Sequence, residues 1–226
     1  MNLPHSVLPA TADAFVLAGG LSTRMGQDKA LISLAGKPLI QHAIDILRHA
    51  GLDPRIAGAR SDFSSFAPIL RDDPSGSGTG PLSGICTALA SGTAELAVFL
   101  PVDLPLLPSR LVAYLLRHAD ITQSAVTLLS ASSFVQTFPV VIRREALPLL
   151  QASLHSDDRN CLKAFREASR ILSKPFTVLP VELLLQSGQI PHSDDFPPAV
   201  WFLNLNSSRE LNRAETLLAG KQLQVS

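Results

Sequence analysis

The sequence predicts an α/β protein in which a mostly parallel sheet lies between two layers of helices. Short apolar runs of strand length, among them residues 14–17 and 97–100, alternate with segments whose apolar side chains recur at helical spacing. Such alternation is typical of parallel strands joined by right-handed crossovers. Several of the apolar runs are followed by glycine, proline or aspartate, at the edge where open α/β sheets bind their ligands.

Length and composition indicate a single domain over residues 1–226, because 46% of the residues are hydrophobic and can build one core. The formal net charge is zero and the basic residues are scattered, so no nucleic-acid partner is expected. No apolar segment reaches transmembrane length, so no membrane partner is expected either. The only cysteines, Cys86 and Cys161, favour reduced, buried thiols in a cytoplasmic protein.

The Gly-rich loop after the first predicted strand is the most informative stretch. The strand at 14–17 stops at Gly19 and Gly20, and Arg24 and Lys29 follow before a helical pattern resumes. Backbone N–H groups of such a loop can wrap phosphates, while Arg24 offers a bidentate fork and Lys29 a compact charge. The spacing matches neither a P-loop nor a Gly-x-Gly-x-x-Gly dinucleotide site. An ordinary strand-to-helix turn with solvated charges is the alternative interpretation.

The next elements alternate between helix and strand. Apolar positions within 39–47 recur at helical spacing, with Pro38 in the first turn and Gly51 at the carboxyl-terminal cap. Weaker apolar patterns at 56–58 and 69–70 predict two further strands.

Residues 71–80 form the most loop-like segment of the chain. Asp72 and Asp73 are equally good candidates for a ligand contact, and either could instead form an Asx turn before Pro74. A helix then opens with Gly80-Pro81-Leu82-Ser83-Gly84. The missing side chains would let the backbone approach a base or ribose, although tight helix–sheet packing explains them as well.

The clearest buried strand, residues 97–100, ends in Pro101-Val102-Asp103-Leu104-Pro105. A carboxylate at this edge would face phosphates held by the Gly-rich loop. A turn or cap aspartate is the alternative, which we disfavour because Ser109 is the better cap for the following helix and the flanking prolines fix the backbone.

The second half of the chain continues with a helix at 110–117 and strands at 124–129 and 140–142. The tetrapeptide His-Ser-Asp-Asp occurs twice, and we interpret both copies as turn chemistry, the first capping the helix that begins near Cys161, rather than as metal sites. Residues 173–198 are rich in proline and could form a lid, an elaboration of an acceptor site or a packing arm.

Residues 200–203 predict a last strand, and Asn204 and Asn206 follow it. Alternation along an extended segment would point both amides to one face. An amide can donate to phosphate and accept from metal-bound water, whereas turn formation is the alternative. Ser207 and Glu210 predict a capping box at the start of the final helix.

These segments together resemble the signature of the molybdenum cofactor guanylyltransferase family, within the nucleotidyltransferases related to sugar-nucleotide pyrophosphorylases. The matching strings follow the family's order and span most of the chain: Leu17-Ala18-Gly19-Gly20-x-Ser22-x-Arg24-Met25-Gly26-x-Asp28-Lys29-Ala30-Leu31, Gly80-Pro81-Leu82-x-Gly84-Ile85, Pro101-x-Asp103-x-Pro105 and Phe202-x-Asn204-x-Asn206. Two positions depart from the family. Phe138 stands where relatives have a polar residue before proline, which puts an acceptor contact there in doubt, and Ser207-Ser208 replaces Thr-Pro.

The resemblance implies a three-layer α/β/α, Rossmann-like nucleotidyltransferase fold and transfer of GMP from GTP to molybdopterin with release of pyrophosphate. It implies Mg²⁺ bound by Asp103, and catalytic roles for Arg24, Lys29 and Asp103. Residues 13–110 would form the nucleotide-binding half and 111–226 the acceptor-binding half, in which Asn204 and Asn206 would contact the acceptor. The implied nucleotide-binding residues are Leu17, Ala18, Gly19, Gly20, Arg24, Lys29, Asp72, Gly80, Pro81, Leu82 and Asp103.

Two other functions remain open at this point. A cytidylyltransferase or sugar-phosphate nucleotidyltransferase could use the same fold, although Gly19-Gly20 favours the guanylyl enzyme because cytidylyltransferases often have Ala-Gly there. A non-catalytic nucleotide-binding module is the other alternative. The presence of Arg24, Lys29 and Asp103 together argues against it.

Overall fold

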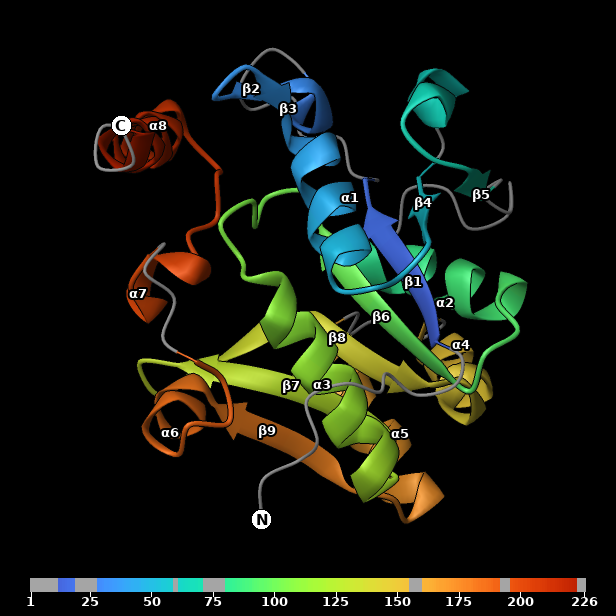
Figure 1. Cartoon of the computed structure of the whole chain (residues 1–226). Helices are drawn as coiled ribbons and strands as arrows, with labels where there is room; N and C mark the ends of the chain where they lie inside the picture. The colour runs from blue at the N-terminus through green and yellow to red at the C-terminus, as the bar shows by residue number, and fades with distance from the viewer. Residues whose placement is uncertain are drawn as a thin grey trace.

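The computed structural model describes residues 12–18, 28–58, 61–70, 80–154, 160–191 and 196–222. Its centre is a seven-stranded sheet in the order β5-β4-β1-β6-β8-β7-β9 (Figure 1). The strands are β1 (Ala12–Leu17), β4 (Pro54–Ala57), β5 (Ile69–Leu70), β6 (Leu96–Pro101), β7 (Val126–Ala131), β8 (Phe134–Arg143) and β9 (Phe176–Pro180). The strands predicted at 14–17, 56–58, 69–70, 97–100, 124–129 and 140–142 are therefore confirmed, with shifted ends.

The sheet is mostly parallel, as the sequence predicts. β8 runs antiparallel to both of its neighbours, β6 and β7, and every other described neighbour pair is parallel. At the end of β1, Leu17 is paired with Ala57 of β4 on one side and with Pro101 of β6 on the other. The chain segments that follow these three strands therefore leave the sheet at one common edge, which we call the carboxyl edge.

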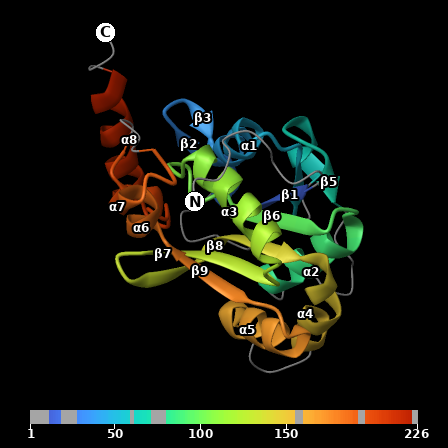
Figure 2. The same ribbon diagram turned by 60° about the horizontal axis from the view of Figure 1, so that its bottom comes forward.

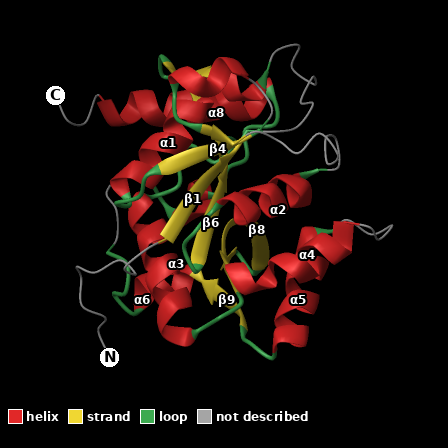
Figure 3. Ribbon diagram, turned by 90° about the vertical axis from the view of Figure 1, so that its right-hand side faces the viewer, coloured by secondary structure: helices red, strands yellow, loops and turns green. Residues whose placement is uncertain are grey.

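Helices cover both faces of the sheet, which gives the predicted three layers. The main helices are α1 (Leu39–His49), α2 (Pro81–Ser91), α3 (Ser109–Thr122), α4 (Leu147–Leu154), α5 (Cys161–Leu172), α6 (Val181–Gln186) and α8 (Ser208–Gln222). Figures 2 and 3 show α1 and α3 on one face and α2, α4 and α5 on the other. β1 serves both layers, because Ala14 and Val16 join one hydrophobic cluster whereas Phe15 and Leu17 join the other.

Several short elements complete the chain: η2 (Lys29–Leu31), β2 (Ser33–Leu34), β3 (Lys37–Pro38), η3 (Ser61–Ser65), η4 (Arg144–Ala146) and α7 (Pro198–Trp201). Local signals explain the helix ends. Gly51 follows α1 with a φ of +84°, the left-handed conformation expected of a carboxyl-terminal glycine. Pro81 occupies the first turn of α2, directly after Gly80.

Three local predictions are wrong. Ser109 does not cap α3: the cap position belongs to Pro108, Ser109 is the first helical residue, and no side chain caps this end. The strand predicted at 200–203 is absent, because Pro198 starts the short helix α7 there, with its first-turn preference. The helix at Cys161 is capped by Asn160, whose side chain accepts from the N–H of Lys163.

The proline-rich stretch 173–198 is a structural part of the domain wherever it is described. It contributes the edge strand β9, which is parallel to β7, and the helix α6. Val181, Leu184, Leu185 and Ile190 are buried in the main hydrophobic cluster. The stretch therefore packs as sheet and helix over this part of its length, and the second His-Ser-Asp-Asp copy, at 192–195, lies outside the described residues, as does the first, at 155–158.

Both cysteines are buried, as predicted. Burial raises the pKa of Cys86 to about 12 and that of Cys161 to about 11, so both thiols stay protonated at neutral pH. Among the described residues, no helix is both long and apolar enough to cross a lipid bilayer.

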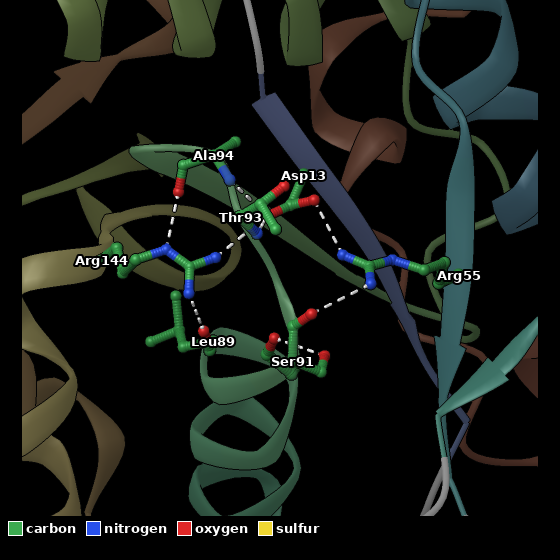
Figure 4. Close-up of polar contacts among 8 residues, drawn as sticks. Asp13, Arg55, Leu89, Ser91, Thr93, Ala94 and Arg144 are labelled. Atoms are coloured by element: carbon green, nitrogen blue, oxygen red, sulfur yellow. Dashed lines mark hydrogen bonds and ion pairs between the residues drawn. The ribbon is translucent and has the colours of Figure 1, made fainter.

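A polar cluster around Asp13 joins the elements at the opposite, amino end of the sheet (Figure 4). Asp13 Oδ1 lies 2.7 Å from a guanidinium nitrogen of Arg55, and Oδ2 lies 3.3 Å from Arg144. Oδ2 also accepts the backbone N–H groups of Thr93 and Ala94, at 2.8 and 3.0 Å. A Cβ at Gly92 would lie 2.2 Å from Oδ2, so this position has no room for a side chain. The Asp13 cluster therefore links β1, β4, η4 and the chain after α2.

Candidate active site

The carboxyl edge of the sheet brings together residues from distant parts of the sequence. Lys29 is the first residue of η2, Asp103 lies two residues after β6, and Asn206 lies two residues before α8. Asp103 is fixed by its neighbours, since Val102 and Leu104 are both buried. The backbone N–H of Leu205 donates to the carbonyl oxygen of Asp103 at 3.1 Å, which holds the chain before α8 against the loop after β6.

Lys29 and Asp103 form an ion pair at this edge. Lys29 Nζ lies 2.9 Å from Asp103 Oδ2, and the two side chains are only 13% and 20% exposed. The pair joins η2, which begins at Lys29, to the loop that follows the central strand β6. An ion pair this sheltered is screened less than one on the open surface.

Asn206 completes a three-residue contact with Lys29 at its centre. Lys29 Nζ donates to Asn206 Oδ1 at 2.5 Å, in addition to its contact with Asp103. An ammonium group has three N–H donors, so one remains for a third acceptor. Among the described residues, Lys29 thus has one N–H donor without an acceptor, at the edge where open α/β sheets bind their ligands.

Asp103 also has a carboxylate oxygen that accepts no hydrogen bond from the described residues. Its second carboxylate oxygen, Oδ1, is buried and has no hydrogen-bond partner within the described chain. A buried, unpaired carboxylate oxygen is costly, and a bound cation is one group that would satisfy it. Among the described residues, no three or more His, Cys, Asp or Glu side chains gather to hold a metal. A single carboxylate nevertheless suits Mg²⁺, which takes one or two carboxylates and completes its shell with waters and substrate phosphates.

The first turn of α2 lies at the same edge. Gly84 of α2 is adjacent to the end of β1, since a Cβ there would lie 3.8 Å from Leu17 Cδ2. This is an ordinary contact, so tight packing alone does not require glycine at this position. Leu17 and Leu82 are buried, so neither offers an open side-chain surface at this edge, and their contacts with a nucleotide stay predictions. Gly80 is exposed and has a φ of +86°, which strains any other residue.

The structure describes only part of the predicted site. Gly19, Gly20, Arg24 and Asp72 lie outside the described residues, so their roles stay predictions. Ala18 is described, and its N–H donates to Ala57 O at 3.0 Å, which extends the pairing of β1 and β4.

The two asparagines behave differently from the prediction that both amides point to one face of an extended segment. The N–H of Asn206 donates to Asn204 O at 3.0 Å, so the chain turns here. Asn206 contacts Lys29, whereas the side chain of Asn204 is exposed and makes no hydrogen bond within the described residues. The turn alternative is therefore correct for the backbone, and Asn206 is the amide that reaches the site.

Two supporting residues were missed as site residues. Asp28 Oδ1 accepts the N–H of Ala30 at 2.9 Å and thereby caps η2, the turn that carries Lys29. Glu210 Oε2 accepts the N–H of Asn206 at 2.8 Å. A cap preference of aspartate could have indicated the first contact. The predicted capping box with Ser207 is confirmed, but its contact with the site depends on the tertiary fold.

A cavity of about 640 Å³ lies elsewhere, between the carboxyl end of α3 and α6. Its walls include Tyr114, His118, Leu183 and Gln189. Burial lowers the pKa of His118, which favours a neutral imidazole. None of the predicted site residues lines this cavity, so it is separate from the cluster at the carboxyl edge.

The family model and the relatives most similar in sequence agree on one protein family. A family model described as the MobA-like NTP transferase domain matches residues 14–171. Molybdenum cofactor guanylyltransferase of Shewanella pealeana is 36% identical over 164 residues, which cover 71% of this chain and 76% of the relative. The protein of the same name from Aliivibrio salmonicida is 28% identical over 93% of this chain and 98% of its own length.

Solved structures agree at the level of the fold. Molybdopterin-guanine dinucleotide biosynthesis protein A from Archaeoglobus fulgidus superimposes with a TM-score of 0.72 and 18% identity, covering 92% of this chain and 99% of that protein. The three-layer nucleotidyltransferase fold expected from the sequence is therefore confirmed.

Proposed function

Because the chain belongs to the MobA-like NTP transferase family, we propose that it transfers GMP from GTP to a molybdopterin cofactor and releases pyrophosphate. The observation that carries the proposal is the ion pair of Lys29 and Asp103 at the carboxyl edge, with Lys29 Nζ 2.9 Å from Asp103 Oδ2. Transfer of a nucleotidyl group needs a cation that stabilises the charge on the phosphates and a carboxylate that can hold a metal ion, and both lie at this edge. GTP as the donor and a molybdopterin cofactor as the acceptor are supported by the two relatives, which are both named molybdenum cofactor guanylyltransferase.

The reaction needs no nucleophile from the protein. An oxygen of the acceptor phosphate attacks the α-phosphorus of GTP, a new P–O bond forms, and the bond to the β-phosphate oxygen breaks. The electron pair leaves with pyrophosphate. Catalysis then consists of positioning and of stabilising negative charge in the transition state. Lys29 stabilises that negative charge with the N–H donor that its described contacts leave over, and Arg24 is proposed to hold phosphate oxygens with its planar fork.

Nucleotidyltransferases of this kind generally use a divalent metal ion, and we propose Mg²⁺ here. Asp103 is the residue that would hold it, because its buried Oδ1 lacks a partner within the described chain. When bound, the ion supplies positive charge against the phosphates and helps to orient them. Asp72 is the next candidate among the carboxylates that the sequence predicts near the nucleotide.

We further propose that residues 1–226 act as one domain, with nucleotide binding in 13–110 and acceptor binding in 111–226. Asn206 supports this division only in part, because it belongs to the second half but contacts Lys29 of the first. A cytidylyltransferase or sugar-phosphate nucleotidyltransferase is not favoured by the names of the relatives. A cytoplasmic location stays a prediction of the sequence.

The experiment measures two properties of the purified protein. In a thermal-shift panel of GTP, CTP, UTP and ATP with Mg²⁺, GTP should give the largest increase in Tm, since a ligand at one hundred times its Kd stabilises by about 2.7 kcal/mol. Transfer of GMP from α-labelled GTP to molybdopterin should then yield a labelled dinucleotide and one pyrophosphate per catalytic turnover. An equal or larger shift with CTP would overturn the guanine assignment, and GTP binding without transfer would favour a non-catalytic module.

A further inference from the structure

The last helix of the chain reaches the centre of the candidate active site through its first turn. α8 lies at the rim of the molecule beside β2, away from the central sheet (Figures 1 and 2). Ala214 is the one buried side chain of α8 among those that the structure describes. At its amino end, Glu210 contacts Asn206 and Ser207, the residues that precede the helix.

A short series of contacts leads from α8 to the ammonium group of Lys29. Glu210 Oε2 accepts the backbone N–H of Asn206 at 2.8 Å, and Asn206 Oδ1 accepts from Lys29 Nζ at 2.5 Å. Ser207 Oγ donates to the same Glu210 oxygen at 3.0 Å, which orients the carboxylate. Glu210 thus holds the backbone of Asn206, and the position of the Asn206 side-chain oxygen, one of the acceptors of Lys29, depends on it.

We propose that Glu210 is a positioning residue for the reaction: it holds Asn206 so that Asn206 and Asp103 together aim the remaining N–H of Lys29 at the substrate phosphates. The proposal rests on the proposed function, because it assumes that Lys29 contacts the phosphates of GTP. The hydrogen bond from Asn206, with smaller contributions from Ser207 and the charge of Lys29, lowers the pKa of Glu210. Glu210 is therefore an anion at neutral pH and accepts strongly.

An alternative role for Glu210 is purely structural, as the reciprocal partner of the capping box. Loss of a helix cap typically destabilises a protein by about 1 kcal/mol and need not change chemistry at a distant site. The two roles differ in what they predict for Asn206. If Glu210 acts by positioning the side-chain amide of Asn206, then removing that side chain makes Glu210 irrelevant to turnover. A purely structural cap has the same effect whether Asn206 is present or replaced by alanine.

The test compares Glu210→Ala, Glu210→Gln and Glu215→Ala in the full chain. Glu215 is an exposed glutamate of the same helix and makes no hydrogen bond with the other described residues, so it controls for loss of charge. Glu210→Ala should lower kcat for GMP transfer by about tenfold while the Kd for GTP with Mg²⁺ changes less than twofold, because misorientation affects the transition state most. Glu210→Gln should restore most of the rate, since its amide oxygen can still accept from Asn206.

Two further measurements keep the proposal open to refutation. In an Asn206→Ala background, Glu210→Ala should cause no additional loss of kcat; a loss that multiplies with that of Asn206→Ala overturns the proposal. The Lys29 side-chain NMR resonance should shift in Glu210→Ala and stay unchanged in Glu215→Ala. If the unaltered protein fails to transfer GMP, the proposed function fails while this NMR comparison still tests the positioning. If it transfers GMP and Glu210→Ala retains full kcat with only a lower Tm, Glu210 is a helix cap alone.

Discussion

Lys29 Nζ lies between Asp103 Oδ2 and Asn206 Oδ1, at 2.9 and 2.5 Å, so one ammonium joins the first loop, the end of the central strand β6 and the segment before the last helix. Each partner comes from a different part of the sequence. The contact gives the carboxyl edge of the sheet a fixed cation.

Lys29→Ala should lower turnover on the order of 10²-fold, because it removes a preorganised positive charge and leaves both of its acceptors without a partner. Arg24→Lys should lower turnover less, because the charge is kept and only the bidentate fork is lost. Pyrophosphate release under single-turnover conditions measures both variants. Near-native release by Lys29→Ala would show that the phosphate cradle has been assigned to the wrong residues.

Asp103→Asn should lower turnover on the order of 10²-fold or more, which is the loss expected when one preorganised electrostatic group is removed. The circular dichroism spectrum should stay unchanged. The substitution preserves shape but removes the anion that pairs with Lys29 and is proposed to bind Mg²⁺. Raising the Mg²⁺ concentration should partly restore the rate if weakened metal binding is the cause. Unchanged turnover and unchanged metal dependence would move the metal site elsewhere, with Asp72 as the next candidate.

Asp13→Ala should destabilise the fold without changing the rate of catalysis by the remaining folded protein. It removes the acceptor shared by Arg55, Arg144 and the N–H groups of Thr93 and Ala94. A loss of about 2 kcal/mol in the free energy of unfolding is expected, allowing for partial solvent screening of the two arginines. Urea unfolding measures it.

Glu167→Ala is the matched control for Asp13→Ala. Its carboxylate pairs with Arg170 one helical turn away on the exposed surface of α5, so its removal should leave stability essentially unchanged. Equal unfolding midpoints for Asp13→Ala and the unaltered protein would mean that the Asp13 cluster is dispensable.

The local sequence determined the elements that depend on nearby residues. Apolar periodicity predicted most of the strands and helices, and Gly51 and Pro81 marked helix ends, because backbone conformation and helix capping are decided within a few residues. The same reasoning failed at Ser109 and at 200–203. There, Pro108 occupies the cap position before Ser109, and Pro198 starts a helix where apolar side chains resembled a strand.

The sequence predicted that Asp103 faces the loop that leads to Lys29, but only the tertiary structure decided which side chains are in contact. The sequence placed Lys29, Asp103 and Asn206 on separate segments, and only the parallel pairing of β1 with β6, together with the bond from Leu205 to Asp103, brings them within hydrogen-bonding distance. It also decided that Asn206 rather than Asn204 faces Lys29, and that Glu210 supports Asn206. Contacts of this kind depend on how distant segments pack, and a single sequence carries no local signal for that packing.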